Sequence, residues 1–226
     1  MSDQPTVSEL ASLAVFPLPN LVLFPGSKLA LHLFEPRYRE MMADCLRVPR
    51  PLIALAQLKP GWQADYYGRP PIYDVAGVGR VGRQARRPDG TYDIELVGVA
   101  RVRLEELPPA QSYRRAAATV LADRLPSRGL PRTELATLMS LATQVVQLAA
   151  RENPGARAEL FASERDEAPL LLDKLADQFV ADPEARQQLL ETLDVSARLD
   201  LLKQSIAGLH VALLSADPGQ GPRTLH

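Results

Sequence analysis

The pattern of hydrophobic and polar residues divides the chain into two parts. From about residue 13 to 124, short segments rich in Val, Leu and Tyr are bounded by Pro or Gly, as is typical of strands. From about 131 to 214, apolar residues recur at helical spacing, and Pro131 marks a helix start. We therefore expect an α+β protein. The expected domains are a β domain (10–125), a helical subdomain (131–214) and a flexible tail (215–226).

The first part combines strands with one short helix and one hairpin. The helix begins at Pro36, because Pro is tolerated in a first helical turn. The hairpin turns at Pro88-Asp89-Gly90, because Pro fixes φ and Asp-Gly supplies the turn. Residues 60–74 form a loop rich in Gly, Pro and aromatic residues. The expected strands are LAVFPLP (13–19), KLALHLF (28–34), LIALAQLK (52–59), VAGVGRVGRQARR (75–87), TYDIELVGVARVRLEEL (91–107) and YRRAAATVLADRL (113–125).

The last helix of the second part carries a regular apolar stripe. Its members alternate at spacings of 4 and 3 over about three heptads, which is the pattern of a packing seam. We expect the stripe to pack on the chain's own helices, with the first half of the helix docked and the protein monomeric or weakly self-associating. The stripe consists of Val195, Leu199, Leu202, Ile206, Leu209 and Leu213.

Composition and charge exclude several classes of protein. The 226 residues are 46% hydrophobic with a formal net charge of -1, so the chain has no global attraction to nucleic acid or anionic membrane. The N-terminal residues lack the positive region of a secretory signal, and no apolar run reaches the length of about 18 residues that a membrane helix needs. Cys45 is the only cysteine, which fits a reducing compartment. We expect a cytoplasmic protein.

No motif predicts catalysis, a metal site or a cofactor. Gly77–Gly82 matches G-x-G-x-x-G, but a strand and hairpin follow it, so no helix N-terminus would hold a phosphate, and we expect strand glycines at a bulge or bend. Cys45, on the apolar face of the short helix, is expected to be a small buried hydrophobe. The histidines are scattered, at His32, His210 and His226.

Three separated segments resemble the N-terminal substrate-recognition domain of Lon protease. They are FPLPNLVLFPGSKLALHLFEPRYREMM (16–42), RRPDGTYDIELVGVARVRLEEL (86–107) and QQLLETLDVSARLDLLKQSIAGL (187–209). The resemblance spans about residues 13 to 213. It implies a twisted, barrel-like β domain of the PUA-like type followed by a helical bundle, with Pro25-Gly26 forming the turn between the first two strands.

The resemblance also implies a function. The chain stops where Lon would continue into its ATPase module, and it has neither a Walker motif nor a Ser-Lys protease domain, so we expect a standalone, non-enzymatic form without cofactor. What remains is binding of unfolded or damaged polypeptides, as an adaptor or modulator of a separate protease in protein quality control. Aromatic and Met side chains supply adaptable apolar contact area. Phe24, Phe34 and Met42 are more often core residues, whereas the loop residues Trp62, Tyr66 and Tyr67 are expected to be more exposed. The candidate binding residues are Phe24, Phe34, Tyr38, Met42, Trp62, Tyr66 and Tyr67.

Two other functions stay open. PUA-like folds also occur in RNA-binding proteins, and an arginine-rich hairpin would supply phosphate contacts; the same arginines are also expected on a solvated sheet face, paired with acids. The third possibility is a structural or assembly module. The arginines are Arg80, Arg83, Arg86, Arg87, Arg101 and Arg103, and the candidate acids are Asp93, Glu95, Glu105 and Glu106.

Overall fold

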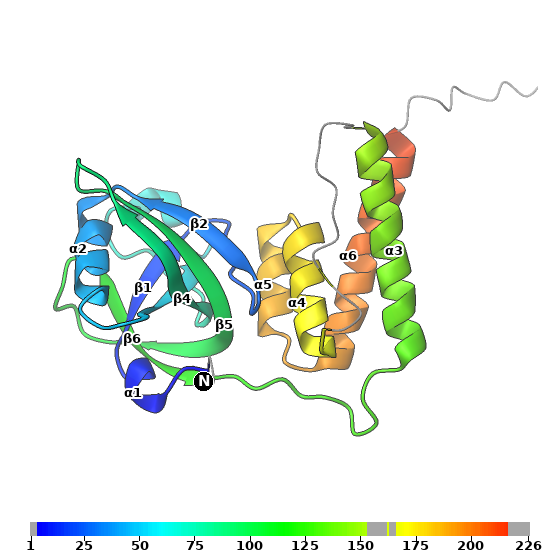
Figure 1. The fold of residues 1–226 in the computed structure, drawn as a ribbon, viewed down its shortest axis with the longest axis horizontal. Coiled ribbons are helices and arrows are strands. Elements are labelled where there is room, and N and C mark those ends of the chain that lie inside the picture. The colour runs from blue at the N-terminus through cyan, green and yellow to red at the C-terminus, as the bar shows by residue number, and fades with distance from the viewer. Residues whose placement is uncertain (1–3, 153–161, 163–165, 217–226) are drawn as a thin grey trace, which may run out of the picture. The chain divides into compact units, whose positions relative to one another are not determined.

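The structure is a computed structural model that describes residues 4–152, 162 and 166–216, and these form two compact units. The β unit consists of residues 4–123 together with Asp182–Leu193. The helical unit consists of the described residues of Arg124–Ala181 and of the chain from Asp194 onwards. The mixture of a sheet and helices agrees with the predicted α+β class (Figure 1). Of the predicted tail, residues 217–226 lie outside the described residues.

The β unit is built on one sheet whose strand order is β2-β5-β4-β3-β1-β6. All neighbouring strands are antiparallel except β1 and β3, which are parallel. Because β6 pairs with β5 as well as with β1, the five strands β5, β4, β3, β1 and β6 form a closed path of pairing. Strand β2 lies outside this path and pairs only with β5. The strands are β1 (Leu13–Leu18), β2 (Lys28–Leu33), β3 (Leu52–Gln57), β4 (Val75–Arg86), β5 (Tyr92–Glu106) and β6 (Arg114–Val120).

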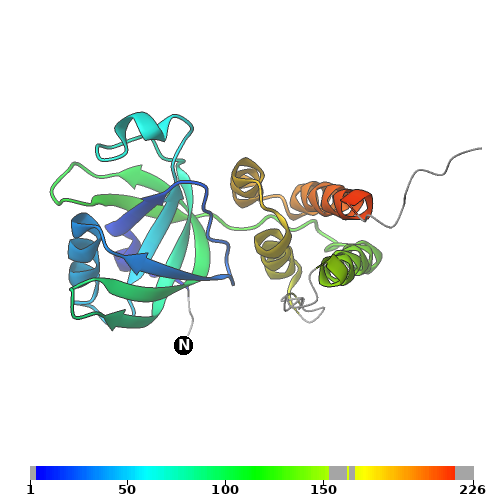
Figure 2. The same ribbon diagram turned by 90° about the horizontal axis from the view of Figure 1, so that it is seen from above.

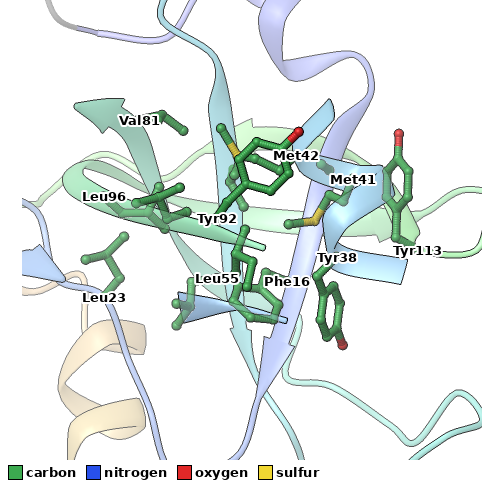
Figure 3. Packing of buried hydrophobic residues seen from close by; sticks show 14 residues of the cluster. Phe16, Leu23, Tyr38, Met41, Met42, Leu55, Val81, Tyr92, Leu96 and Tyr113 are labelled. Carbon is green, nitrogen blue, oxygen red and sulfur yellow. The ribbon is translucent and has the colours of Figure 1, made fainter. Parts of the chain in front are cut away.

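Short helices complete the β unit. They are α1 (Val7–Leu10), α2 (Pro36–Cys45), the 3-10 turn η1 (Trp62–Asp65) and α5 (Pro183–Glu191). Helix α2 begins at Pro36 as predicted, and its apolar face enters a core cluster that also contains residues of the sheet (Figure 3). The cluster members labelled in Figure 3 are Phe16, Leu23, Tyr38, Met41, Met42, Leu55, Val81, Tyr92, Leu96 and Tyr113.

The glycines of β4 and β5 have a packing reason. The loop after β1 crosses these strands, and a side chain at Gly77 would collide with the carbonyl oxygen of Leu23. A side chain at Gly98 would collide in the same way with the carbonyl oxygen of Phe24. The sheet register also shifts between Val78 and Gly79, where the sequence predicts a bulge or bend. The G-x-G-x-x-G pattern therefore lies within a strand and makes room for a crossing backbone.

Helix α5 belongs to the β unit although it lies within the predicted helical segment. The guanidinium of Arg186 donates to the carbonyl oxygen of Val22 at 3.1 Å and stacks over the ring of Phe24 at 5.1 Å. The buried amide of Gln187 donates to the carbonyl oxygen of Val75, at the start of β4, at 2.9 Å. Residues 131–214 therefore supply helices to both units.

The helical unit contains α3 (Arg132–Glu152), α4 (Ala168–Phe179) and α6 (Val195–Ala216), with α6 packed against the other two helices. Asp194 caps α6 by accepting from the backbone N–H groups of Ser196 and Ala197. The first part of the predicted stripe, up to Ile206, is buried, and its last two leucines are partly exposed. Helix α6 lies beside α3 and α4 (Figure 2). Arg198 of α6 and Asp173 of α4 form a buried ion pair in this unit, with the charged groups 3.2 Å apart.

Candidate functional site

The structure separates the predicted binding residues into two groups. Three of them are buried in the core of the β unit: Phe24 (0% exposed), Tyr38 (3%) and Met42 (0%). Phe24 and Met42 are closed to a partner in this conformation, and Tyr38 contributes only a small exposed area, to the wall of the cleft described below. The other four are at least partly accessible: Phe34 (63% exposed), Tyr67 (87%), and the half-buried Trp62 and Tyr66. The accessible group is the starting point for the candidate site.

Three accessible aromatic rings form a continuous row in the loop between β3 and β4. Trp62 and Tyr66 meet edge to face with ring centroids 5.5 Å apart, and Tyr66 and Tyr67 do the same at 5.1 Å. Gly61 has a φ of 88°, which lets the chain turn into η1 just before the first of these rings. We call this segment, residues 61–68, the aromatic loop.

The aromatic loop is tied to the start of α2. The hydroxyl of Tyr66 donates to Glu35 Oε1 at 2.8 Å, and Arg37 Nε donates to Glu35 Oε2 at 3.0 Å. The guanidinium of Arg37 also lies 4.7 Å from the ring centroid of Tyr38 and 5.4 Å from that of Tyr66. Partial burial, followed by the hydrogen bond to Glu35, raises the pKa of Tyr66, so its phenol stays neutral. These contacts hold the loop in place and leave Tyr67 exposed.

A cleft of about 240 Å³ opens beside the aromatic loop. Its lining is aromatic and cationic, and it includes Pro17, Arg37, Tyr38, Tyr67, Arg69, Tyr113 and Arg114. Burial and the hydrogen bond to Asp44 raise the pKa of Tyr113 to about 12, so this wall is uncharged at neutral pH. Arg114 donates to the carbonyl oxygen of Pro70 at 2.6 Å and to Glu106 at 3.1 Å, which fixes its guanidinium. Such a lining suits an apolar or aromatic side chain, or a carboxylate.

Two kinds of reactive group are relevant among the described residues, a cysteine thiol and a metal site. Burial raises the pKa of Cys45 to about 11, so its thiol is protonated at neutral pH and is a poor nucleophile. Within the described part of the chain, no group of three His, Cys, Asp or Glu side chains is placed to hold a metal ion. None of the helices described has the length and apolar character needed to cross a membrane.

The hairpin arginines do not share one surface. Arg80 is buried and donates to Glu9 at 2.8 Å, and Arg101 is buried and donates to Asp123. Arg87 pairs with Asp93 at 2.6 Å. Arg87 is exposed together with Arg83, Arg86 and Arg103.

Sequence reasoning did not identify several residues of the site. Glu35 and Arg37 lie in the segment 16–42 that resembles Lon, but the sequence assigned them no role in a site, and Tyr113 lies in no motif. Two of the contacts that matter here join distant residues: Tyr66 is 31 residues from Glu35, and Tyr113 is 69 residues from Asp44. The available signals were the membership of Glu35 and Arg37 in that segment and the position of Glu35 directly before the helix start at Pro36.

The comparisons with known proteins agree on one family. The model of the ATP-dependent protease La (LON) substrate-binding domain matches residues 12–207. Lon protease 2 of Myxococcus xanthus is 27% identical over 219 residues, covering 94% of this chain and 26% of the relative. Lon protease of Paraburkholderia phytofirmans is 29% identical over 215 residues, covering 93% of this chain and 26% of the relative. The chain thus spans about a quarter of the length of these curated relatives.

Solved structures show the same fold. The N-terminal domain of a Mycobacterium avium complex Lon protease superimposes with a TM-score of 0.61 at 15% identity, covering 87% of this chain and 98% of that one. A Lon N-terminal domain protein from Xanthomonas campestris superimposes with a TM-score of 0.57 at 21% identity, covering 84% and 96%.

Proposed function

The chain belongs to the family of ATP-dependent protease La (LON) substrate-binding domains, and on this premise we propose that it is a polypeptide-binding module. The observation that carries the proposal is the family match over residues 12–207. The closed path of strand pairing supports the barrel-like, PUA-like description that the resemblance implies. Because the matched domain is one for substrate binding, we further propose that it acts in the cytoplasm as a non-enzymatic adaptor or modulator of a separate protease.

The aromatic loop supports a site for exposed apolar segments of unfolded or damaged polypeptides. Tyr67 and Trp62 place aromatic surface where a partner can reach it, and the adjacent cleft adds tyrosine walls and arginines. Tyr and Trp are the residues most often responsible for binding energy at protein interfaces. Phe34 adds a second exposed ring next to Glu35, the anchor of the loop.

Binding to fluorescein-labelled β-casein, an unfolded protein, tests the proposal. Truncating the loop rings together, Trp62→Ala with Tyr67→Ala, is expected to weaken binding about tenfold or more. The matched control truncates two exposed residues of α6, Val211→Ala with Leu214→Ala, and is expected to leave binding unchanged. Absence of casein binding to the wild-type chain would refute the function, whereas equal binding by both double variants would refute the site alone.

The RNA-binding alternative is supported by fewer arginines than the sequence predicted. Arg80 and Arg101 are buried in ion pairs, and the exposed Arg87 is paired with Asp93. Among the predicted arginines the phosphate contacts would therefore fall mainly to Arg83, Arg86 and Arg103. Labelled single-stranded RNA tested in the same assay distinguishes the two functions, because affinity that depends on phosphate contacts falls steeply with added salt.

A further inference from the structure

Strand β2 lies at an open edge of the sheet (Figure 1). It pairs with β5 on one side, in the register from Lys28 opposite Val97 to Leu33 opposite Tyr92. On its other side, no strand pairs with it among the residues that the structure describes. An open edge carries backbone N–H and C=O groups that can template another strand.

The register determines which backbone groups face the open side. In an antiparallel pair, residues alternate between those that exchange hydrogen bonds with the neighbouring strand and those that point away from it. Gly98 N donates to the carbonyl oxygen of Ser27 at 2.9 Å, so the adjacent pair of Lys28 and Val97 is one that does not exchange hydrogen bonds. Alternation then directs the N–H and C=O groups of Lys28, Ala30 and His32 towards the open side.

The neighbouring strand confirms this assignment independently. Val81 N of β4 donates to the carbonyl oxygen of Pro51, on the side away from β5. The preceding residue, Arg80, therefore directs its backbone groups to its partner Val97 on β5. The backbone N–H and C=O groups of Val97 therefore point to β4 and not to β2. The hydrogen bond from Gly98 N to Ser27 leads to the same result, because neighbouring residues of a strand point their backbone groups to opposite sides.

The side chains along this edge are accessible and chemically varied. Burial alternates along β2, with Lys28, Ala30 and His32 exposed and the intervening leucines turned to the core. The rings of His32 and Phe34 stack with centroids 6.1 Å apart, and Phe34 is 63% exposed. Lys28 makes no ion pair within the described part of the chain. The outer face of the edge thus runs from a cation at one end to an aromatic pair at the other.

We infer that the open edge of β2 binds an extended segment of a client polypeptide as an added strand. The inference rests on the proposed function and states how polypeptide is held. A peptide backbone satisfies the outward N–H and C=O groups of Ala30 and His32 together, as in other cases of strand addition. The segment presents an apolar or aromatic side chain beside His32 and Phe34, and a carboxylate beside Lys28.

Charge argues for a client over a second copy of this chain. Pairing of two β2 edges would place Lys28 opposite residues of another β2, whose exposed members are Lys28, Ala30 and His32. None of these supplies a carboxylate. A client segment with an acidic residue does, and the cross-strand pair then stabilises the added strand.

A pair of substitutions at one position isolates the backbone contribution. Ala30→Pro removes an outward N–H without removing a bond to β5, and Pro is tolerated in edge strands. Ala30→Val is the matched control, because the valine side chain is similar in size to that of proline and the backbone N–H is kept. With the full chain and fluorescein-labelled β-casein, Ala30→Pro is expected to bind about tenfold more weakly. Ala30→Val is expected to stay within about twofold of wild type.

Amide hydrogen exchange by NMR tests the same inference without a variant. Adding β-casein is expected to slow exchange at Ala30 and His32, and to leave Leu29 and Leu31, already bonded to β5, unchanged. If casein binds without slowing exchange selectively at Ala30 and His32 and without a difference in affinity between Ala30→Pro and Ala30→Val, binding at the β2 edge is refuted. The proposed function then stands. If casein does not bind, both fail. Slow exchange at Ala30 and His32 without casein would also refute the inference. If this protection grows with protein concentration, a second copy of the chain covers the edge; if it does not, the chain's own residues cover it.

Discussion

The buried ion pair of the helical unit leads to a stability prediction with a defined size. Arg198 is 0% exposed and Asp173 is 1% exposed, and their charged groups lie 3.2 Å apart. Substituting Asp173→Ala leaves a buried guanidinium without this counter-charge. Breaking such a pair costs about 3–5 kcal/mol, a large part of the roughly 5–15 kcal/mol that stabilises a typical domain. We expect the helical unit of this variant to be largely or wholly unfolded near 37 °C.

Urea unfolding monitored by two signals measures this effect and locates it. Far-UV circular dichroism follows the helices, whereas the fluorescence of Trp62, the only tryptophan, follows the β unit. Asp173→Ala is expected to shift the helical transition to lower urea and to leave the fluorescence transition in place. The control replaces both charges, Asp173→Leu with Arg198→Met, and is expected to recover most of the loss, because apolar pairs of similar volume often replace buried ion pairs at little cost. A loss below about 1 kcal/mol in the single variant, or no recovery in the double variant, would refute the reasoning.

Three further predictions concern pH, thiol chemistry and association. The hydrogen bond from Arg80, followed by those from Thr6, lowers the pKa of Glu9 from 4.5 to about 2, so its contribution is complete above pH 4.5 and is lost as the pH falls towards 2. Because Glu9 is partly exposed, we expect this contribution to be about 1 kcal/mol, and Glu9→Gln to remove that part of the acid dependence of the fluorescence-monitored urea midpoint. Cys45 is half-buried and its pKa is raised to about 11, so it should react slowly with iodoacetamide at pH 7.5 and rapidly in urea; rapid reaction of the folded chain would contradict the raised pKa. Light scattering should give the monomer mass of 24.8 kDa with and without Leu209→Asp; a stable dimer that this substitution separates would contradict the monomer prediction.

Features that depend on neighbouring residues were predictable from the sequence. In the hairpin, Gly90 has a φ of 82°, and its N–H donates to the carbonyl oxygen of Arg87, as the Asp-Gly turn requires. Asp182 caps α5 by accepting from Ala185 N at 2.7 Å, and Pro183 follows it. These contacts span a few residues, so the identities of those residues are sufficient to predict them.

Features that depend on distant contacts were not predictable in this way. The pattern of α5 is that of any amphipathic helix, and its place in the β unit follows from Arg186 and Gln187 meeting backbone carbonyls more than a hundred residues away. The same limit applies to burial. Phe24 and Phe34 both lie in apolar runs. Phe24 belongs to the crossing loop and is buried, with Arg186 of α5 over its ring, whereas Phe34 follows the end of β2 and is exposed.

The residues that make the chain recognisable are largely those that hold it together. Gly98 allows the crossing loop to approach, and Arg198 pairs with Asp173 inside the helical unit. Both lie in the segments that resemble Lon. Because these residues are buried or approached closely by backbone, a motif built on them identifies the fold and not a contact with a client. Client contacts have to be sought where the fold leaves groups accessible: in this chain, the ring of Tyr67 and the outward backbone of Ala30, neither of which belongs to a catalytic or nucleotide-binding motif.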